Sequence, residues 1–587
     1  MMNERLIDIA LGNAPADLVI KNGKLVNVIS REIYPADIAI ADGLIAATGE
    51  LEPGAIGPAT QVIDAGGKYL APGFIDAHIH FESSMLTFSE FARAVLSKGT
   101  TAVATDLMEI AIVSGPEGIK ETFREAEGSP LTLLHTVPSF MSEEGDMQTI
   151  GAALHHDLIE ELIRQPQAVG LAEFLVPPAL AKSPESAKLL ELAGQLGKTV
   201  EGHGPELYGP SLNAYAGTGV NSDHESTNRA EALEKIRRGM RVLMREGSAA
   251  SDLVACLDII TKDKIDPRYC SMVSDDIDML HIRDKGHQDY KVRMAVAHGV
   301  DPVVAIQMVT INPAEGLKID RIRGSICPGK AADIALLSSL EQCTVDSVVA
   351  GGKLVVENKK PVFAMPAFTY GKCMLQTVKL PKAISAADLL IAAPGASKAK
   401  VHVIGAKGTT LLTERLEADL PVANGTVSAD IPNDILHLAC VERYGKSGGI
   451  GKSFIKGFKL QSGAIATSVG HDHHNITALG ASADDMALAI NRIAEMHGGL
   501  ALAEGGKIIG ELPLPICGLL TDMDCDTAAG ILAGIQAELG KRGCDMASPF
   551  MTLAFITLIF IPMFGITDRG LVDVLEFKVI DPVIASS

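Results

Sequence analysis

The stretch GFIDAHIHFESS, residues 73–84, places two histidines one residue apart directly after an apolar run. Phe74 and Ile75 predict a buried strand, and His78 and His80 follow it at its carboxyl end. Residues i and i+2 of a strand point to the same side, so both imidazoles can reach one ion. A lone pair of this kind is more often incidental than a metal site. Whether this pair binds metal therefore depends on which other polar residues the fold places beside it.

Seven further apolar segments follow at spacings that leave room for helices. Helical patterns cover residues 87–99, 183–197 and 229–239. Eight strands, each followed by a helix or by a loop long enough for one, are typical of a (β/α)8 TIM-type barrel of about 250 residues. We therefore expect an α/β fold with a barrel over residues 71–320. The eight predicted strands are GFIDA, TTAVAT, LTLLHTV, AVGLAEF, KTVEGH, GVNSDH, RVLMRE and YCSMVSDD.

Both flanks of this region are rich in short strands and turns. Asn-Gly in residues 17–28 and Asp-Gly in residues 37–49 each lie between apolar runs, a pattern that predicts β-hairpins. Similar patterns return in residues 329–338 and 347–358. We expect residues 1–70 and 321–380 to form one small, discontinuous β-sandwich domain. Residues 381–587 are expected to form an additional mixed α+β domain with a strong helix near residues 483–499.

The composition excludes several classes of protein. The chain has 51 basic and 72 acidic residues, a net charge of −21, which argues against binding nucleic acid through a general basic surface. Nine cysteines without a CxxC pair argue against a disulfide framework or a cysteine zinc site and favour a reducing cytoplasm. The N-terminus lacks the apolar core of a secretory signal. The uncharged segment Met551–Ile566 is shorter than the roughly 20 residues of a membrane span and contains Pro562, so we expect a buried strand or helix.

Polar residues recur at the ends of five predicted strands. In a barrel these ends face one mouth, where catalytic residues collect. Imidazoles and carboxylates together suit a divalent first-row metal, and this set is large enough for two ions that share a bridging carboxylate and an activated water. The residues are His78, His80, Glu173, His203, His224, Asp275 and Asp276.

The opening stretch resembles the first signature of the amidohydrolase superfamily. APGFIDAHIH followed by ESSMLTFSEFARAVLSKGTTAV resembles the bacterial adenine deaminase family more specifically. The resemblance continues through GLAEF, EGHGPELYGPSLNAYAGTGVNSDHES and GKSFIKGFKLQSGAIATS to ITDRGLVDVLEF, so it covers nearly the whole chain.

This resemblance implies hydrolytic deamination of adenine to hypoxanthine and ammonia by a metal-activated hydroxide, in purine salvage or catabolism. It implies two divalent ions, manganese or iron(II). His78 and His80 would hold the first ion, His203 and His224 the second, and Glu173 would bridge them. Asp275 would bind metal and carry a proton, which makes Glu173 and Asp275 the catalytic residues. The candidates for contact with the purine are Glu82, Glu109 and Asp276, although Glu82 can equally be a surface or helix-capping carboxylate.

Departures from the family pattern leave substrate choice open. The family sequence DPHEIAN is DLMEIAI here, with Leu107 and Met108 in place of proline and histidine. The family's aspartate-serine-histidine-asparagine is DHHN, residues 472–475. His471, His473 and His474 can hold a further ion, line the mouth from the C-terminal domain or a neighbouring subunit, or belong to a polar loop.

Alternative functions follow from these departures. The chain can be a related amidohydrolase acting on another amino-heterocycle or cyclic amide, or a weakly active binding homologue. GKSGGIGKS, residues 445–453, resembles a phosphate loop only superficially, and no nucleotide phosphate site is expected there. The expected setting is cytoplasmic, with a small-molecule purine substrate, no nucleic acid or membrane partner, and a homodimer or higher homo-oligomer.

Overall fold

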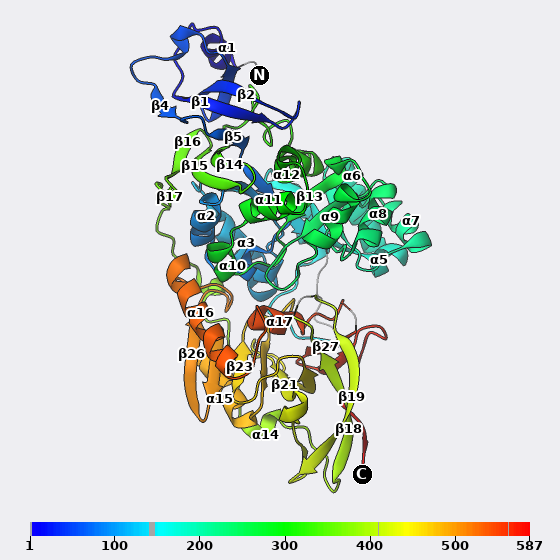
Figure 1. Ribbon diagram of the computed structural model, residues 1–587. Helices are drawn as coiled ribbons and strands as arrows, with labels where there is room; N and C mark the ends of the chain where they lie inside the picture. Colours follow the sequence, from blue (N-terminus) through cyan, green and yellow to red (C-terminus); the bar gives the residue numbers. More distant parts are fainter. Residues whose placement is uncertain (1–2, 140–146, 409, 562) are drawn as a thin grey trace.

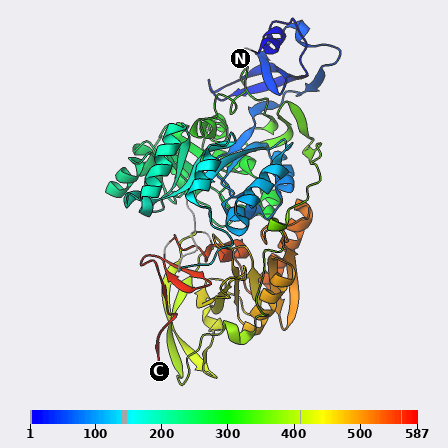
Figure 2. The ribbon, with the colours of Figure 1, turned by 180° about the vertical axis from the view of Figure 1, so that it is seen from behind.

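The computed structural model describes residues 3–139, 147–408, 410–561 and 563–587. Three parts follow one another along the long axis of the molecule, as Figures 1 and 2 show from opposite sides. A β-rich part containing the N-terminus lies at one end, the barrel lies in the middle, and the C-terminal part lies at the other end. The chain ends therefore lie far apart.

The middle part is a parallel eight-stranded barrel whose strands follow one another in chain order, as predicted. An isolated bridge at the mouth joins the chain after its last strand to the chain after its first. There the His80 N–H donates to the Asp275 carbonyl (3.2 Å), and the Asp275 N–H donates to the His78 carbonyl (3.1 Å). The seam thus closes on residues proposed as metal ligands. The strands are β6 (Phe74–Asp76), β7 (Thr100–Thr105), β8 (Thr132–Pro138), β9 (Ala168–Leu175), β10 (Thr199–His203), β11 (Ser222–Asp223), β12 (Arg241–Arg245) and β13 (Cys270–Val273).

Helices cover the outside of the barrel, and their sequences explain their limits. In α2 (Phe88–Leu96), the Thr87 side chain caps the first turn, and the apolar stripe of the helix is buried in the main core. Helix α6 (Pro184–Gln195) begins after the Ser183 cap, with proline in the first turn. The others are α3 (Met108–Ala126), α4 (His156–Ile163), α5 (Val176–Leu180), α7 (Gly209–Ala216), α8 (Arg229–Arg237), α9 (Leu253–Thr261), α10 (Met279–Asp284), α11 (Gln288–Ala297), α12 (Pro302–Gln307) and α13 (Ile311–Gly316).

Strands from both flanks of the barrel join one nine-stranded sheet, which confirms the expected pairing of residues far apart in sequence. The join is antiparallel, between β5 and β14. Alternation along β1 and β2 buries apolar side chains on both faces of this sheet, in two separate clusters. The short helix α1 (Glu4–Ala10) covers one face. The strands are β1 (Leu18–Asn27), β2 (Glu32–Ala41), β3 (Leu44–Gly49), β4 (Gln61–Asp64), β5 (Tyr69–Pro72), β14 (Ile334–Ser339), β15 (Thr344–Ala350), β16 (Lys353–Glu357) and β17 (Lys360–Pro361).

One predicted hairpin is wrong. Asn22 and Gly23 do not turn the chain but form a bulge inside the continuous strand β1. Asn22 has a φ of 57°, its N–H donates to Asp37 (2.8 Å), and its side chain donates to Asp64 (3.0 Å). This bulge and a tight hairpin turn both place asparagine at positive φ, so the local sequence does not separate them. The predicted Asp-Gly hairpin, between β2 and β3, is confirmed.

The C-terminal part is a ten-stranded mixed sheet, and helix α15 (Ala483–Glu495) packs on it where the sequence predicts a helix. Its Ser482 cap and apolar face explain the helix. The strands are β18 (Lys398–Gly405), β19 (Glu414–Ala423), β20 (Thr426–Val427), β21 (Ile435–Val441), β22 (Ile450–Lys456), β23 (Ala464–Thr467), β24 (Ile476–Gly480), β25 (Gly499–Glu504), β26 (Lys507–Pro513) and β30 (Val583–Ser586). The sheets support our proposed division into residues 1–70 plus 321–380, 71–320 and 381–587.

The apolar segment Met551–Ile566 is divided between two elements. Its first residues end helix α17 (Pro549–Phe555), and its last begin strand β27 (Phe564–Thr567); Pro562 lies outside the described residues. Strands β28 (Gly570–Asp573) and β29 (Lys578–Ile580) complete a small sheet with β27, and α16 (Cys525–Lys541) lies at the edge of this part. Among the described helices, none has the length and hydropathy needed to cross a membrane.

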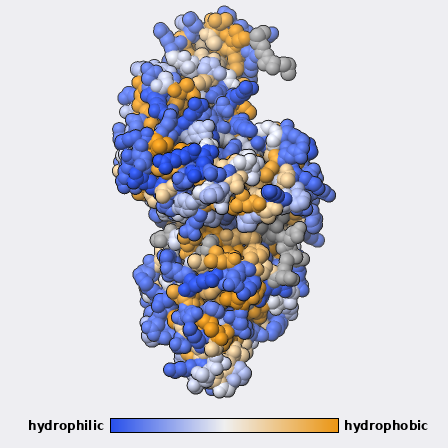
Figure 3. Space-filling model, turned by 90° about the vertical axis from the view of Figure 1, so that its right-hand side faces the viewer, coloured by the Kyte–Doolittle hydropathy of each residue, from blue (hydrophilic) through white to orange (hydrophobic). Residues whose placement is uncertain are grey.

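Helix α17 lies between the C-terminal sheet and the barrel (Figure 1). On the face drawn in Figure 3, hydrophobic surface gathers near the junction between the barrel and the C-terminal part. The C-terminal part is therefore placed to cover the barrel mouth.

The glycine-rich loop before β22 is filled by the protein itself. The Glu442 carboxylate accepts hydrogen bonds from the backbone N–H groups of Lys446 (3.1 Å) and Gly448 (2.9 Å). A side-chain carboxylate thus occupies the place where an anion would lie in a phosphate loop. This agrees with the expectation that no nucleotide phosphate binds there.

Candidate metal centre and active site

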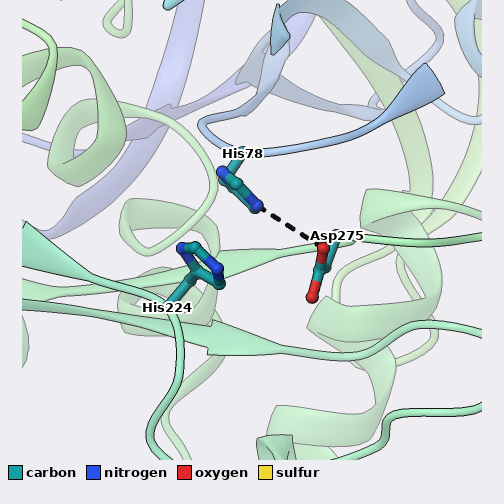
Figure 4. A group of neighbouring side chains, drawn as sticks. All are labelled: His78, His224 and Asp275. Carbon is teal, nitrogen blue, oxygen red and sulfur yellow. Dashed lines mark ion pairs between the residues drawn. The ribbon is translucent and has the colours of Figure 1, made fainter. Parts of the chain in front are cut away.

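Six side chains proposed from the sequence as metal ligands meet at the barrel mouth. Their donor atoms form three overlapping groups, and within each group the atoms lie within 4.8 Å of one another. Figure 4 shows one group, in which His78, His224 and Asp275 point toward one another from separate strands. The groups are His78, His80 and Glu173; Glu173, His203 and His224; and His78, His224 and Asp275.

Glu173 belongs to two of these groups and lies between them. Its Oε1 is 3.5 Å from Nε2 of His80 and 3.5 Å from Nε2 of His224, and its Oε2 is 2.6 Å from Nδ1 of His203. Glu173 has a φ of 56° at a bulge where β9 shifts register against β10. Strained backbone of this kind collects at functional sites, and here the bulge directs a carboxylate into the barrel. This position suits a ligand shared by two ions.

Buried carboxylates behind the histidines fix the orientation of the rings. Glu201 Oε1 lies 2.9 Å from Nδ1 of both His78 and His224, and Asp106 Oδ1 lies 3.1 Å from Nδ1 of His80. When the Nδ1 atoms carry the protons in these hydrogen bonds, the Nε2 lone pairs face the site. Metal-binding histidines are commonly oriented in this way.

A buried guanidinium balances the negative charge of the site. Arg245 is 1% exposed and donates to Glu225 and Asp275 at 2.9 Å each, and it also pairs with Asp252. Burial raises the pKa of Asp275, but the polar contact with His78 (3.5 Å) and the charge of Arg245 outweigh it and hold that pKa well below its usual range. Asp275 is therefore held as a carboxylate.

The residues present fit a pair of divalent ions. Within the described chain, Nε2 of His78 and Nε2 of His203 are buried without any hydrogen-bond partner, which is costly unless another group meets them. The donors are imidazole nitrogens and carboxylate oxygens, which suit zinc, manganese or iron(II).

A cavity opens over this group of side chains. Its floor and walls come from the barrel and include Glu225 and Asp276. Its roof comes from the C-terminal part of the same chain and is mostly apolar. The roof residues are Leu411, His471, Asp472, Phe555, Leu558, Phe560 and Ile561.

The histidine cluster of the C-terminal part divides into two roles. His471 lines the cavity, whereas His473 and His474 are fully buried behind it. Glu109 accepts from Nδ1 of His471 (2.8 Å) and pairs with Nε2 of His474. The proposed third metal at this cluster conflicts with the tautomer of His474. The Gly470 N–H donates to its Nδ1 (3.1 Å), so the ring proton is on Nε2 and points at Glu109.

The residues predicted to contact the purine lie in different places. Asp276 and Glu109 line the cavity, but both oxygens of Glu109 are engaged by histidines. Glu82 is buried, is not among the lining residues, and accepts from the Ile110 N–H (3.5 Å). Burial and two nearby carboxylates raise the pKa of Glu82 to about 8. Met108 lines the cavity at the position where the family has histidine.

Several residues of the site were missed from the sequence, although some left a signal. Glu201 precedes His203 by two positions on β10, so alternation places it on the same side. Arg245 is the last residue of β12, at the mouth. Phe555 in the roof left no signal in the sequence, because it reaches the cavity only when the C-terminal part docks on the barrel.

The matches to known proteins follow the same division of the chain. Residues 69–355 match the amidohydrolase family, and residues 410–578 match the adenine deaminase C-terminal domain. The barrel and its histidine–carboxylate cluster define the class: a hydrolase of the amidohydrolase family with metal-binding clusters.

The relatives that match the whole chain are more specific. Adenine deaminase 1 of Carboxydothermus hydrogenoformans is 40% identical, covering 99% of this chain and 98% of the relative. The adenine deaminase of Moorella thermoacetica is 38% identical, covering 99% and 98%, and that of Mesorhizobium japonicum is 38% identical, covering 99% and 97%. The chain belongs to the adenine deaminase family.

Proposed function

We propose that this protein hydrolyses adenine to hypoxanthine and ammonia. The observation that carries the proposal is its relation, over 99% of its length, to proteins named adenine deaminase. The cavity also supports the proposal, because its apolar roof and polar floor suit a small heterocyclic ligand. Water and adenine are consumed, and the exocyclic amino group leaves as ammonia.

We propose that two divalent ions, manganese or iron(II), bind at the three overlapping groups. His78 and His80 would hold one ion, His203 and His224 the other, and Glu173 would lie between them. When bound, such a pair supplies a water of lowered pKa near the substrate.

The chain's own residues would then move the protons. Asp275 is proposed to take a proton from the attacking water and pass it to the purine ring, where charge develops as C6 is attacked. Its Oδ1 faces the Nε2 atoms of His78 and His80 at 3.5 Å each, while Arg245 holds its Oδ2 at 2.9 Å. Arg245 thereby fixes the carboxylate against rotation. The leaving amino group needs a proton of its own before it departs.

A second candidate substrate class rests on Met108. Its apolar side chain lines the cavity where family members have histidine, so another amino-heterocycle or cyclic amide is the alternative. The homo-oligomer and the cytoplasmic setting remain predictions.

Purified protein loaded with manganese or iron(II) is expected to consume adenine and release one ammonia per adenine. Turnover of a different heterocycle, with none of adenine, would favour the alternative substrate. No turnover and no bound metal would favour a binding homologue.

A further inference from the structure

The C-terminal part places a polar side chain in the roof of the cavity. Among the described lining residues from that part, His471 and Asp472 are polar and the others are apolar. The backbone of His471 is anchored to the residues around α17: its N–H donates to the Ala554 carbonyl (3.0 Å), and its carbonyl accepts from Thr557 Oγ1 (2.6 Å). Its ring stacks on Phe555, with centroids 5.2 Å apart. The imidazole is therefore fixed before any ligand enters.

Glu109 connects this histidine to the barrel. Because the Gly470 N–H donates to Nδ1 of His474, the ring proton of His474 points at one oxygen of Glu109. The other oxygen accepts Nδ1–H of His471 at 2.8 Å. This series places a proton on Nδ1 of His471 toward Glu109, so Nδ1 of His471 is fully used.

The second nitrogen of His471 is left without a hydrogen bond. Its Nε2 is buried, has no hydrogen-bond partner among the described residues, and lies 3.4 Å from Asp276 Oδ1 across the cavity wall. The ring is 3% exposed. Burial opposes the charged form of His471, but Asp276 and Glu109 outweigh it and raise its pKa to about 10. This N–H faces a carboxylate but makes no hydrogen bond, so it is available to a ligand that accepts from it.

We propose that His471 binds the substrate by donating its Nε2–H to a ring nitrogen of the purine, and that Glu109 is the residue that positions it. This assignment rests on the proposed function for the identity of the ligand. It gives the C-terminal part a direct role in recognition. It also gives Glu109 a role through His471, because both of its oxygens are already engaged.

The test compares ring analogues in which one nitrogen of adenine is replaced by CH: 1-, 3- and 7-deazaadenine. Their dissociation constants and that of adenine would be measured by calorimetry on wild type and His471→Ala before manganese is added, so that no ligand is deaminated during the titration. One analogue is expected to bind wild type about 10- to 100-fold more weakly than adenine because it lacks the accepting nitrogen. In His471→Ala that difference is expected to shrink below threefold, while the differences for the other two analogues persist.

His473→Ser is the matched control. His473 is equally buried and two residues away, but its Nδ1 accepts from the Asn475 N–H (3.0 Å) and it does not line the cavity. This control should keep the wild-type pattern, and all three proteins should keep the same number of metal ions per chain. If His471→Ala does not fold, His471→Asn, whose shorter side chain does not reach, and Glu109→Gln provide the same comparison.

The two possible failures are distinguishable. Deazaadenine differences that are the same in wild type and His471→Ala would overturn the role of His471, whether or not adenine is turned over. If His471→Ala bound fewer metal ions than wild type, the substrate-binding role of His471 would be overturned, and the residue would be a metal ligand instead. A wild type that shows the His471-dependent difference but does not deaminate adenine would overturn the proposed function and leave this assignment standing.

Discussion

Glu201 is the residue whose loss should affect both proposed metal ions at once. Its Oε1 accepts from Nδ1 of His78 and from Nδ1 of His224, at 2.9 Å each. These histidines belong to different proposed ions, and the carboxylate is 4% exposed, so water does not replace it readily. No other residue described in the site orients one histidine of each pair.

The size of the effect follows from these two contacts. Loss of an outer carboxylate partner typically costs 10- to 100-fold in metal affinity, or about 1.4–2.7 kcal/mol for each ion. We expect Glu201→Ala to weaken both ions by this amount. Glu201→Gln should lie near the lower limit, because the amide oxygen still accepts while the charge is gone.

The assay is competitive titration of manganese against a fluorescent chelator, which resolves the two binding constants. Glu246→Gln is the control: Glu246 is also 4% exposed but contacts none of the six proposed ligands. Two metal constants unchanged in Glu201→Ala would refute the orienting role. A change in only one would show that His78 and His224 do not serve different ions.

Four further outcomes are expected. Glu173→Ala should lose both metal and activity, measured by metal analysis beside ammonia release; retention of two ions per chain would contradict the bridging role. Arg245→Met should destabilise the metal-free protein by about 3–5 kcal/mol, since three buried carboxylates lose their cation; denaturant midpoints test this. Met108→His should change kcat/KM for adenine without changing metal content; equal values for both proteins would show that this wall does not select the substrate. Burial lowers the pKa of His135 from 6.5 to about 4, so its stabilising neutral form is present above pH 6.5 and is lost as pH falls through 4. Wild type should therefore lose about 2 kcal/mol between pH 7.5 and 5 relative to His135→Leu, and parallel pH profiles would contradict this.

The sequence predicted the barrel well because its signals are local. Each strand is a short apolar run, and each proposed ligand lies at or next to the end of one. His203 ends β10, and Asp275 follows β13 by two residues. Strand order in a barrel then brings the ends together without further information. This is why residues about 200 positions apart could be grouped before any coordinates were known.

The remaining features depended on information that is not local. The roof needs the C-terminal part to dock on the barrel, and no periodic pattern in residues 471 or 555 encodes that contact. The Asn-Gly bulge was misread because the same backbone angles serve a turn and a bulge. Glu201 was not predicted, because His203, two residues later, was already assigned as the polar residue at the end of that strand.

The side chain at position 108 can change while the proposed metal ligand His80 keeps its support, and Asp106 is the reason. Its Oδ1 accepts from the Met108 backbone N–H (3.1 Å) and also holds Nδ1 of His80 (3.1 Å). The chain at residue 108 is thus tied to a proposed metal ligand through its backbone, not through its side chain. Replacing histidine by methionine at this position changes what a ligand meets and leaves the support of His80 in place. On our proposal, the departure from the family pattern therefore bears on which ring is bound and leaves the proposed metal ligands in place.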